Sequence, residues 1–351
     1  SQALFQQPVN RSGTTGFFRR RYDVKYDVAA PYGSVNYRFG KIAIGASVRY
    51  DIGQVRGQTF GADLGGGRPG IQSVDFNGNG TISIPESRTA FTPLARPGPV
   101  DYSYKYISYS TGINYRVSEP FAMFVRYSRG ARANADKVLF SNKVSVTDGS
   151  MPDSADGYDI VKQLEGGFKY RDNGLTVNVT AFLANTEDTN VQAGAITTDR
   201  DYRAYGVESE AGYRYGPFSL TGGVTYTKAT LVNDDLNPAV AGMAPRRQPD
   251  FIFQAMPQFE VKKFTIGANF TGTTSSYTQD MNNLRLPGYT IVNGFLQFRP
   301  IERVQLMLDA NNLFDKLAFF EITQASIPAS GVGVGRAVNG RTVTASLRLD
   351  F

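Results

Sequence analysis

Residues 75–86 carry oxygen-bearing side chains at the spacing of a twelve-residue calcium loop. The candidate ligands are Asp75, Asn77, Asn79, the backbone carbonyl of Thr81, Ser83 through a water molecule, and Glu86 through both carboxylate oxygens. Gly80 stands sixth, where the loop turns sharply. Two carboxylates alone predict weak binding, with a Kd on the order of 10⁻⁴ to 10⁻³ M. The alternative is a glycine-rich turn without metal, because Asn-Gly pairs also mark turns.

Catalysis has little support in the composition. The chain has no histidine and no cysteine, which excludes imidazole-based acid–base chemistry, histidine ligation of haem, thiolate metal sites and disulfides within these residues. Two adjacent carboxylate pairs, Glu187-Asp188 and Asp234-Asp235, are of the kind that glycosidases use. Both fall in or near predicted loops, where solvated carboxylates are the simpler interpretation. The sequence therefore predicts a protein that is not an enzyme.

Aromatic and basic groups offer further binding candidates. Tyr102, Tyr104 and Tyr106 share one face of a predicted strand and suit either stacking on sugar rings or a membrane-interface girdle. Residues 19–21 are three arginines that could bind an anionic solute or lipopolysaccharide phosphate. Alternation instead favours an ion-pair ladder with Asp23, Lys25 and Asp27 on a water-facing lumen wall. The net charge of +6 is spread out, and no stacking platform or phosphate loop indicates a nucleic-acid partner.

Strict alternation of apolar and polar residues is the dominant pattern of the chain. In the last segment the apolar positions are Val343, Ala345, Leu347, Leu349 and Phe351, and the positions between them are polar. Such a strand has one apolar and one wet face. The pattern recurs upstream in segments of ten residues or more, as membrane-crossing strands require, whereas no apolar run approaches the ~18 residues of a membrane helix.

About thirteen strands are predicted, alternately joined by short turns and by long polar stretches. They are 17–39, 41–56, 99–116, 119–132, 156–171, 174–188, 201–215, 217–231, 250–262, 263–275, 287–299, 303–319 and 340–351. The first is expected to bulge at Ala30-Pro31, where the apolar phase slips by one residue. The prediction is an all-β, transmembrane antiparallel barrel wall over 17–351. Residues 1–16 are expected to be an extracellular loop remnant, and 57–98 a long extracellular loop that contains the calcium loop.

An odd number of strands cannot place both chain ends on the same side of a membrane, whereas single-chain bacterial barrels normally do so. The edge strands would also expose unpaired backbone groups to lipid. The pattern therefore predicts the C-terminal portion of a larger barrel.

Several segments resemble TonB-dependent outer-membrane receptors, a family of plugged barrels of about 22 strands. The similar segments are 201–210 (DYRAYGVESE), 286–289 (LPGY), 311–316 (NNLFDK), 26–32 paired with 45–51, and the terminal strand with its final Phe351. The branch that it most resembles is the Caulobacter-like and Xanthomonas-like one, which is often linked to carbohydrate uptake.

This resemblance implies a receptor in the Gram-negative outer membrane that binds a scarce solute and passes it inward when the TonB–ExbB–ExbD complex displaces an N-terminal plug. The implied partners are that complex, the plug and remaining strands, membrane lipid and the solute. The favoured solute is an oligosaccharide, and a ferric siderophore is the alternative. A passive porin or structural barrel stays open as another class.

Overall fold

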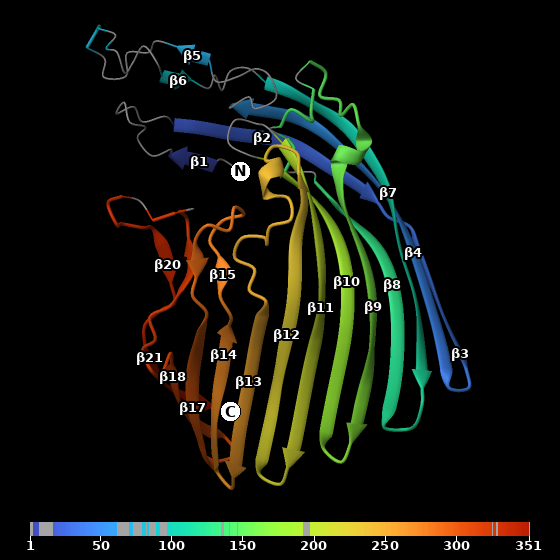
Figure 1. Cartoon of the computed structure of the whole chain (residues 1–351), viewed down its shortest axis with the longest axis vertical. Coiled ribbons are helices and arrows are strands. Elements are labelled where there is room, and N and C mark those ends of the chain that lie inside the picture. Colours follow the sequence, from blue (N-terminus) through green and yellow to red (C-terminus); the bar gives the residue numbers. More distant parts are fainter. Residues whose placement is uncertain are drawn as a thin grey trace.

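The computed structural model is an all-β chain built on one curved antiparallel sheet of 15 strands (Figure 1). It describes residues 3–6, 17–61, 70–72, 79–81, 83, 89–91, 97–134, 137–139, 141–145, 147–191, 197–324, 326–327 and 329–350. Within these residues, no helix is long and apolar enough to cross a membrane.

Strands of the main sheet follow one another in chain order, and each is hydrogen-bonded to the next except that β2 and β3 both pair with β4. They are β1 (Ala3–Gln6), β2 (Phe17–Ala29), β3 (Tyr32–Phe39), β4 (Ile42–Gly61), β7 (Pro97–Arg116), β8 (Phe121–Ala133), β9 (Tyr158–Asp172), β10 (Leu175–Val191), β11 (Thr197–Tyr215), β12 (Phe218–Asp234), β13 (Phe251–Val261), β14 (Phe264–Thr273), β17 (Tyr289–Ile301), β18 (Val304–Asn311) and β21 (Thr342–Leu349). β2 and β3 both pair with β4, one above the other. β1 lies at the N-terminal edge, in a stretch for which no strand was expected.

Short and long connections lie at opposite ends of the sheet, as the sequence predicted (Figure 1). The lower turns are tight and use left-handed residues such as Gly40, Gly174, Gly216 and Lys262. The upper connections carry the small hairpins β5 (Gly70–Gln72) with β6 (Thr89–Phe91), β15 (Ser276–Tyr277) with β16 (Arg285–Leu286), and β19 (Phe319–Ile322) with β20 (Gly335–Ala337). Where the upper connections are described, they also carry the 3₁₀ turns η2 (Ser154–Gly157) and η3 (Pro238–Val240).

The convex face of the lower sheet is a continuous apolar belt. Its cross-strand pairs include Leu164 with Leu183, Leu183 with Tyr205, Ile266 with Leu296, Leu296 with Leu308, and Leu306 with Leu347. On β4 the belt runs from Ile42 to Ile52. At about 3.3 Å per residue and a tilt of about 45° that row is roughly 23 Å tall, close to the ~25 Å apolar band of membrane barrels.

Polar residues occupy the other, concave face. Ser47 and Ser110 stand directly opposite each other on β4 and β7, with their hydroxyl oxygens 2.9 Å apart. One hollow of about 540 Å³ is lined by such residues from β3 as far as β11, which places them on the inside of the curve. The alternation predicted from sequence is therefore confirmed, with its apolar row facing outward.

Toward the upper end, the polarity of the two faces reverses on β4 and β7. Their register is unbroken from Ile42↔Tyr115 to Phe60↔Pro97, so Val55 and Tyr102 share the concave face with Ser47 and Ser110. Val55 and Tyr102 are nevertheless apolar and buried, while their outward neighbours Arg56 and Asp101 are exposed and form an ion pair. The upper strands thus behave as part of a water-exposed domain with an apolar interior.

This reversal corrects the expected bulge at Ala30-Pro31. Ala29 pairs with Ile52 and Tyr32 pairs with Arg49, so the same register runs through the proline, whose carbonyl accepts a hydrogen bond from the Tyr50 amide. No residue is inserted. The apolar phase slips because the upper apolar residues of this strand face inward and the lower ones face outward. The same register places Asp23, Lys25 and Asp27 on the convex face, so the predicted lumen-facing ladder is also wrong, although Lys25 and Asp27 do pair at 3.2 Å.

The segment 311–316 ends β18 earlier than the predicted residue 319. Asn312 and Asp315 adopt left-handed backbone angles, which break the strand. The buried Asn312 amide donates to the carbonyls of Lys316 and Asn339 and accepts from the Lys316 N–H. Asp315 accepts from the Arg341 N–H, which ties this turn to the start of β21.

Candidate binding surface on the concave face and its loops

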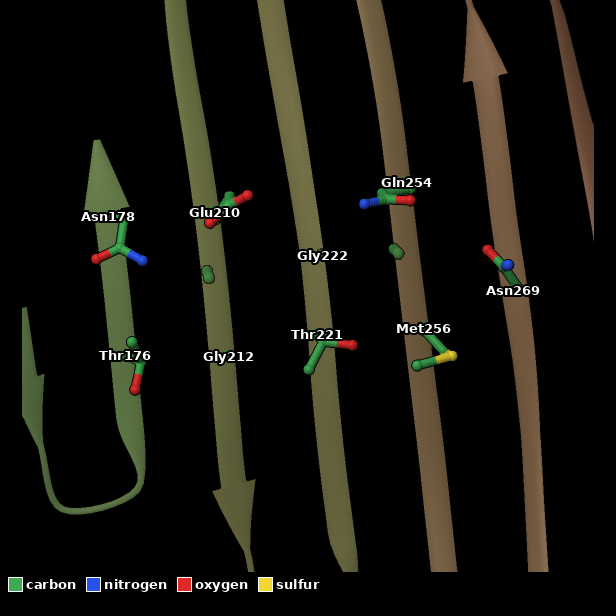
Figure 2. Close-up of a pocket in the computed structure, with 11 residues that line it drawn as sticks. Thr176, Asn178, Glu210, Gly212, Thr221, Gly222, Gln254, Met256 and Asn269 are labelled. Carbon is green, nitrogen blue, oxygen red and sulfur yellow. The ribbon is translucent and has the colours of Figure 1, made fainter. Parts of the chain in front are cut away.

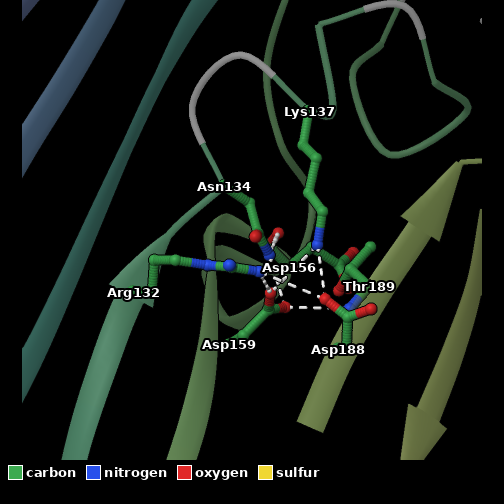
Figure 3. Close-up of polar contacts among 7 residues, drawn as sticks. All are labelled: Arg132, Asn134, Lys137, Asp156, Asp159, Asp188 and Thr189. Carbon is green, nitrogen blue, oxygen red and sulfur yellow. Dashed lines mark hydrogen bonds and ion pairs between the residues drawn. The ribbon is translucent and has the colours of Figure 1, made fainter. Parts of the chain in front are cut away.

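An ion-pair network around the buried Asp159 holds the connection between β8 and β9 against β9 and β10 (Figure 3). Asp159 on β9 accepts hydrogen bonds from Arg132 at 3.0 Å, Asn134 at 2.7 Å, Lys137 at 3.3 Å and the Thr189 N–H at 3.0 Å. Asp188 on β10 receives the same two cations, at 3.1 Å from Arg132 and 2.7 Å from Lys137. Two carboxylates and two cations thus balance where β8, β9 and β10 meet the loop (described below as the β8–β10 network).

Opposing effects set the pKa of Asp159. Burial, the largest, raises it, but the hydrogen bonds from Asn134, Thr189 and Arg132 and the charge of Lys137 together outweigh burial and lower the pKa. The side chain of Asp159 is only 4% exposed, so the carboxylate is retained in its charged form by these partners. Lys143 behaves alike: burial lowers its pKa, while Asp156 at 2.7 Å and Asp199 at 3.0 Å raise it by more.

A second network joins the next upper connections. Arg200 on β11 contacts Asp234 on β12 at 2.7 Å and Asp280, between β15 and β16, at 3.2 Å. Asp280 also accepts from the Arg246 N–H, and Asp234 accepts from the N–H groups of Leu236 and Asn237. Arg247 continues the chain of contacts to Glu321 on β19 at 2.8 Å. The loops are therefore fixed to one another across much of the upper rim.

These contacts determine the surroundings of the two predicted carboxylate pairs, Glu187-Asp188 and Asp234-Asp235. Asp234 is fully buried against Arg200, whereas Asp235 is exposed and accepts from the Asn233 amide. Asp188 belongs to the β8–β10 network. Glu187, the residue before it, lies on the convex face and pairs in register with Asp201. Neither pair presents two carboxylates to one solute. The expectation that both are simply solvated is also wrong for Asp234 and Asp188.

Tyr102, Tyr104 and Tyr106 lie on the concave face, which excludes a membrane-interface girdle for them. Tyr102 and Tyr104 are buried beneath Val138, Leu139, Val144 and Met151 of the β8–β9 connection and cannot stack on a solute. Tyr104 also fills the space over Gly53, where any side chain would collide with its ring. Tyr106 is half-buried. Its ring stacks on Tyr104, with ring centres 5.8 Å apart, and packs at a tilt against Tyr158, with ring centres 5.2 Å apart. Tyr26, stacked on Tyr104, is 44% exposed.

Lower on the same face, two hollows offer uncovered polar groups. One of about 510 Å³ is lined by Thr176, Asn178, Glu210, Thr221, Gln254 and Asn269, from five successive strands (Figure 2). The 540 Å³ hollow adds Arg126, Glu165 and Lys169 beside Asn36 and Asn114. Hydroxyls, amides and charges of both signs therefore line the wall, which can donate and accept hydrogen bonds.

The predicted calcium loop is described only in part. Asp75, Asn77 and Glu86 lie outside the described residues, whereas Asn79, Thr81 and Ser83 are exposed. The Asn79 side chain accepts from the Thr81 N–H at 2.8 Å, and Gly80 has a φ of +77°, the turn geometry expected at the sixth position. Among the residues that the structure describes, no cluster of three acidic side chains forms a metal site.

A sheet with a membrane-height apolar belt outside, a polar wall inside, tight turns below and long loops above is the wall of an outer-membrane β-barrel. Residues 2–313 match the family model described as "TonB dependent receptor-like, beta-barrel". The chain belongs to this family, whose members lie in the outer membrane of Gram-negative bacteria. The match ends before β21, so the terminal strand and the second half of segment 311–316 lie beyond it.

Solved structures agree on the fold. The ferric yersiniabactin uptake receptor FyuA from Yersinia pestis superposes with a TM-score of 0.75 at 14% identity, over 100% of this chain and 49% of that one. The ferric-catecholate import receptor Fiu from E. coli K12 gives 0.67 at 17% identity, over 97% and 46%. The ferric citrate transporter FecA gives 0.64 at 13% identity, over 100% and 57%. The chain thus spans about half the length of these receptors.

Sequence reasoning identified the wall but missed the loop networks. Arg132 with Asp159 and Arg200 with Asp280 join residues that are 27 and 80 positions apart. No local spacing marks such pairs. The only signal available was the position of Asp159, Arg200 and Asp234 at predicted strand ends, where isolated charges need partners once loops cover them.

Proposed function

We propose that the protein containing this chain takes up a scarce solute across the outer membrane, with an oligosaccharide as the favoured solute. The observation that carries the proposal is the concave wall, where hydroxyl and amide groups of β10, β12, β13 and β14 line a hollow together with the Glu210 carboxylate of β11. Uncharged donors and acceptors suit a polyhydroxylated solute, because each hydroxyl can both give and accept a hydrogen bond. Binding and gating then require no covalent step by this chain.

The proposed partners follow from the family. An N-terminal plug would fill the concave face, further strands would pair with the edges at β1 and β21, and lipid would cover the apolar belt. The TonB–ExbB–ExbD complex would supply energy by acting on the plug. Uptake that continues after the inner-membrane proton gradient is dissipated would instead favour a passive porin.

A ferric siderophore or similar chelate is the second candidate. FyuA and Fiu are described as receptors for ferric chelates, and the wall here also carries Arg49, Arg126 and Lys169, which could bind an anionic chelate. An oligosaccharide without charge would make less use of these cations.

Uptake of labelled solutes by cells that carry the intact receptor separates these possibilities. We expect oligosaccharide uptake to fall at least fivefold in the Asn178→Leu, Gln254→Leu double variant, while Asn185→Leu, on the convex face of β10, leaves it unchanged. Uptake of ferric chelates alone, with loss in an Arg126→Gln variant, would replace the oligosaccharide proposal. Equal uptake by all variants would remove the concave hollow from the proposal.

We also propose that residues 75–86 bind calcium and stiffen the connection between β4 and β7. This connection is shorter than the predicted loop at 57–98, because β4 continues to Gly61 and β7 begins at Pro97. Two features support calcium binding: the Gly80 turn and the exposed oxygens of Asn79, Thr81 and Ser83. Calorimetric titration of the intact receptor with calcium should show a Kd on the order of 10⁻⁴ to 10⁻³ M. The Asp75→Ala, Glu86→Ala variant should show no binding at the same concentrations, and equal heats from both proteins would contradict the site.

A further inference from the structure

A third hollow, of about 520 Å³, opens on the concave face of β3, β4, β7 and β8. It lies directly below Asp51 and Tyr106, which stand opposite each other on β4 and β7 at the foot of the upper part. Tyr32, Arg49 and Arg126 line it, together with serines of β4, β7 and β8. We call it the arginine hollow.

The guanidinium of Arg49 is held in place by Asp51. Its Nε donates to both oxygens of Asp51 at 3.0 Å, and its Nη2 donates to Oδ1 at 2.7 Å. The Asp51 side chain is only 2% exposed, whereas that of Arg49 is 56% exposed. Because the guanidinium is planar, the edge formed by Nη1 and the second N–H of Nη2 points away from Asp51. That edge has no acceptor among the described residues, and its two parallel N–H groups match a carboxylate.

Arg126 supplies the net charge of the hollow, since Asp51 balances Arg49. Its side chain lies on the concave face and is exposed. Glu165 stands opposite Arg126 in the register, yet no carboxylate of the described residues lies within 4.0 Å of this arginine. An anion in the hollow would therefore meet a cation without a close counterion on one side and the oriented Arg49 on the other.

Tyr32 and the serines provide the contacts that a sugar ring needs. Tyr32 stands directly opposite Arg49 on the neighbouring strand and is 81% exposed, so its ring can stack on the apolar face of a pyranose. Ser108 is the other cross-strand neighbour of Arg49. Below them a row of serines crosses three strands at one height: Ser47, Ser110 and Ser128. Each hydroxyl can both donate and accept a hydrogen bond.

The three hollows of the concave wall differ in charge. The 510 Å³ hollow is lined by the Glu210 carboxylate and by no cation of the described residues. The 540 Å³ hollow shares residues with both of the others and carries charges of both signs. The arginine hollow has arginines and, within the described part of the chain, no carboxylate. A neutral sugar would make little use of these cations, whereas an acidic sugar would be repelled by Glu210 and attracted here.

We propose that the arginine hollow binds a carboxylate-bearing ring of the solute, which is therefore an acidic oligosaccharide that contains hexuronate residues. This inference rests on the oligosaccharide uptake proposed above and specifies the class of sugar. The carboxylate lies between Arg49 and Arg126 and accepts charge-assisted hydrogen bonds from both. The ring stacks on Tyr32, and its hydroxyls bond to the serines.

Calorimetric titration of the intact receptor tests this with matched pairs of probes. The acidic probes are the trisaccharides of galacturonate, glucuronate, mannuronate and guluronate. Each is compared with the neutral trisaccharide made by reducing its carboxylates to primary alcohols. At least one acidic probe should bind about tenfold or more tightly than its reduced partner, because only the carboxylate uses the two arginines.

Three variants locate the effect. Arg49→Gln and Arg126→Gln should each remove most of the preference for the acidic probe, and Arg126→Gln does so with the Arg49–Asp51 pair intact. Tyr32→Ala should weaken binding of the acidic and the reduced probe by the same factor, because stacking does not depend on the carboxylate. The matched control is Arg38→Gln, an exposed arginine on the concave face of β3 that lines none of the three hollows. It should retain the full preference.

The outcomes separate this inference from the proposed function. Binding of reduced trisaccharides in preference to acidic ones would overturn the acidic class and leave oligosaccharide uptake standing. An equal loss of preference in Arg38→Gln would also overturn it, because the response would then be to the total charge of the concave face. Binding of ferric chelates and of no trisaccharide would remove both proposals.

Discussion

The lower and upper parts of this sheet have the same strands and the same register, but their two faces have opposite polarity. Below, Ile44 and Val48 face outward and Ser47 faces the concave side. Above, Arg56 faces outward and Val55 is buried on the concave side. The backbone pairing cannot distinguish the two parts. The surroundings distinguish them. In the lower part, lipid covers the convex face and water reaches the concave face. In the upper part, water reaches the convex face and a folded loop covers the concave face.

This difference teaches that alternation reports only which residues share a face. It does not say which face is buried, because either a lipid phase or a packed loop can cover an apolar row. Where the lipid-covered part of a strand meets the loop-covered part, the apolar residues change from one face to the other. The alternation in the sequence then shifts by one residue without any irregularity of the backbone.

Removal of Tyr104 should have the largest effect, and it should be confined to the upper part. Its ring is 1% exposed and fills the space between Gly53 and the β8–β9 connection, so Tyr104→Ala should cost about 3–5 kcal/mol in the free energy that keeps this connection closed. Hydrogen exchange should accelerate on the order of a hundredfold or more at the Asp101 N–H, which is bonded to the Gly149 carbonyl.

Tyr32→Ala is the control for this experiment. Tyr32 lies on the same concave face but is 81% exposed, so its removal should leave exchange of the Asp101 N–H unchanged. Equal acceleration in the two variants would mean that the upper part has no separate apolar interior.

An arginine on the convex face should be costly only within the belt. Val179 lies midway along the belt row of β10, which runs from Leu175 to Leu183, and Asn185 follows on the same face just above it. Val179→Arg should lower the free energy of unfolding in lipid vesicles by about 2–4 kcal/mol, and Asn185→Arg by about 0–1 kcal/mol. Denaturant titration of the intact receptor measures both. Similar costs at the two positions would contradict the boundary between them.

Sequence alone predicted the wall and not what covers it. The strand bounds from β4 to β17 agree to within five residues, because the apolar rows are long and short polar or glycine-containing turns separate the strands at the lower end. The β2–β3 strand was misinterpreted at Pro31, because Val24 and Tyr26 look like lipid-facing residues until a loop is known to lie over that side. Contacts such as Arg200 with Asp280 depend on how long loops fold together, which leaves no periodic signal.

The β8–β10 network should make closure of the upper part depend on pH. The folded-state pKa of Asp159 is lowered, so its contribution is complete above the usual pKa of an aspartate, about 3.9, and is lost as pH falls below that value toward the folded-state pKa. Limited proteolysis between residues 134 and 157 should therefore accelerate below about pH 4. The lower part, held by its lipid-facing residues, should resist proteolysis throughout.

Asp159→Asn should remove most of this pH dependence and cost about 1–3 kcal/mol at neutral pH, because Arg132 and Lys137 lose one of their two carboxylates. Asp235→Asn, which alters an exposed carboxylate, should leave the proteolysis profile as it is. A persistent acid transition in Asp159→Asn would assign it to other groups.

Pro31 should have the smallest effect, since it lies where the polarity reverses in an unbroken register. Pro31→Val should change the free energy of unfolding by less than about 1 kcal/mol, because no bulge has to be rebuilt and the new N–H faces the β4 partner.

Site-directed spin labelling can show which face of the sheet each residue next to Pro31 occupies. The chain has no cysteine of its own, so a single introduced cysteine carries the only label. Labels at Asp27 and Val35 should both lie on the convex face, the first accessible to a water-soluble relaxation agent and the second to oxygen dissolved in lipid. A label at Val35 that reports the concave side would mean that one residue is inserted at the proline, and the reversal of polarity would then be a change of register.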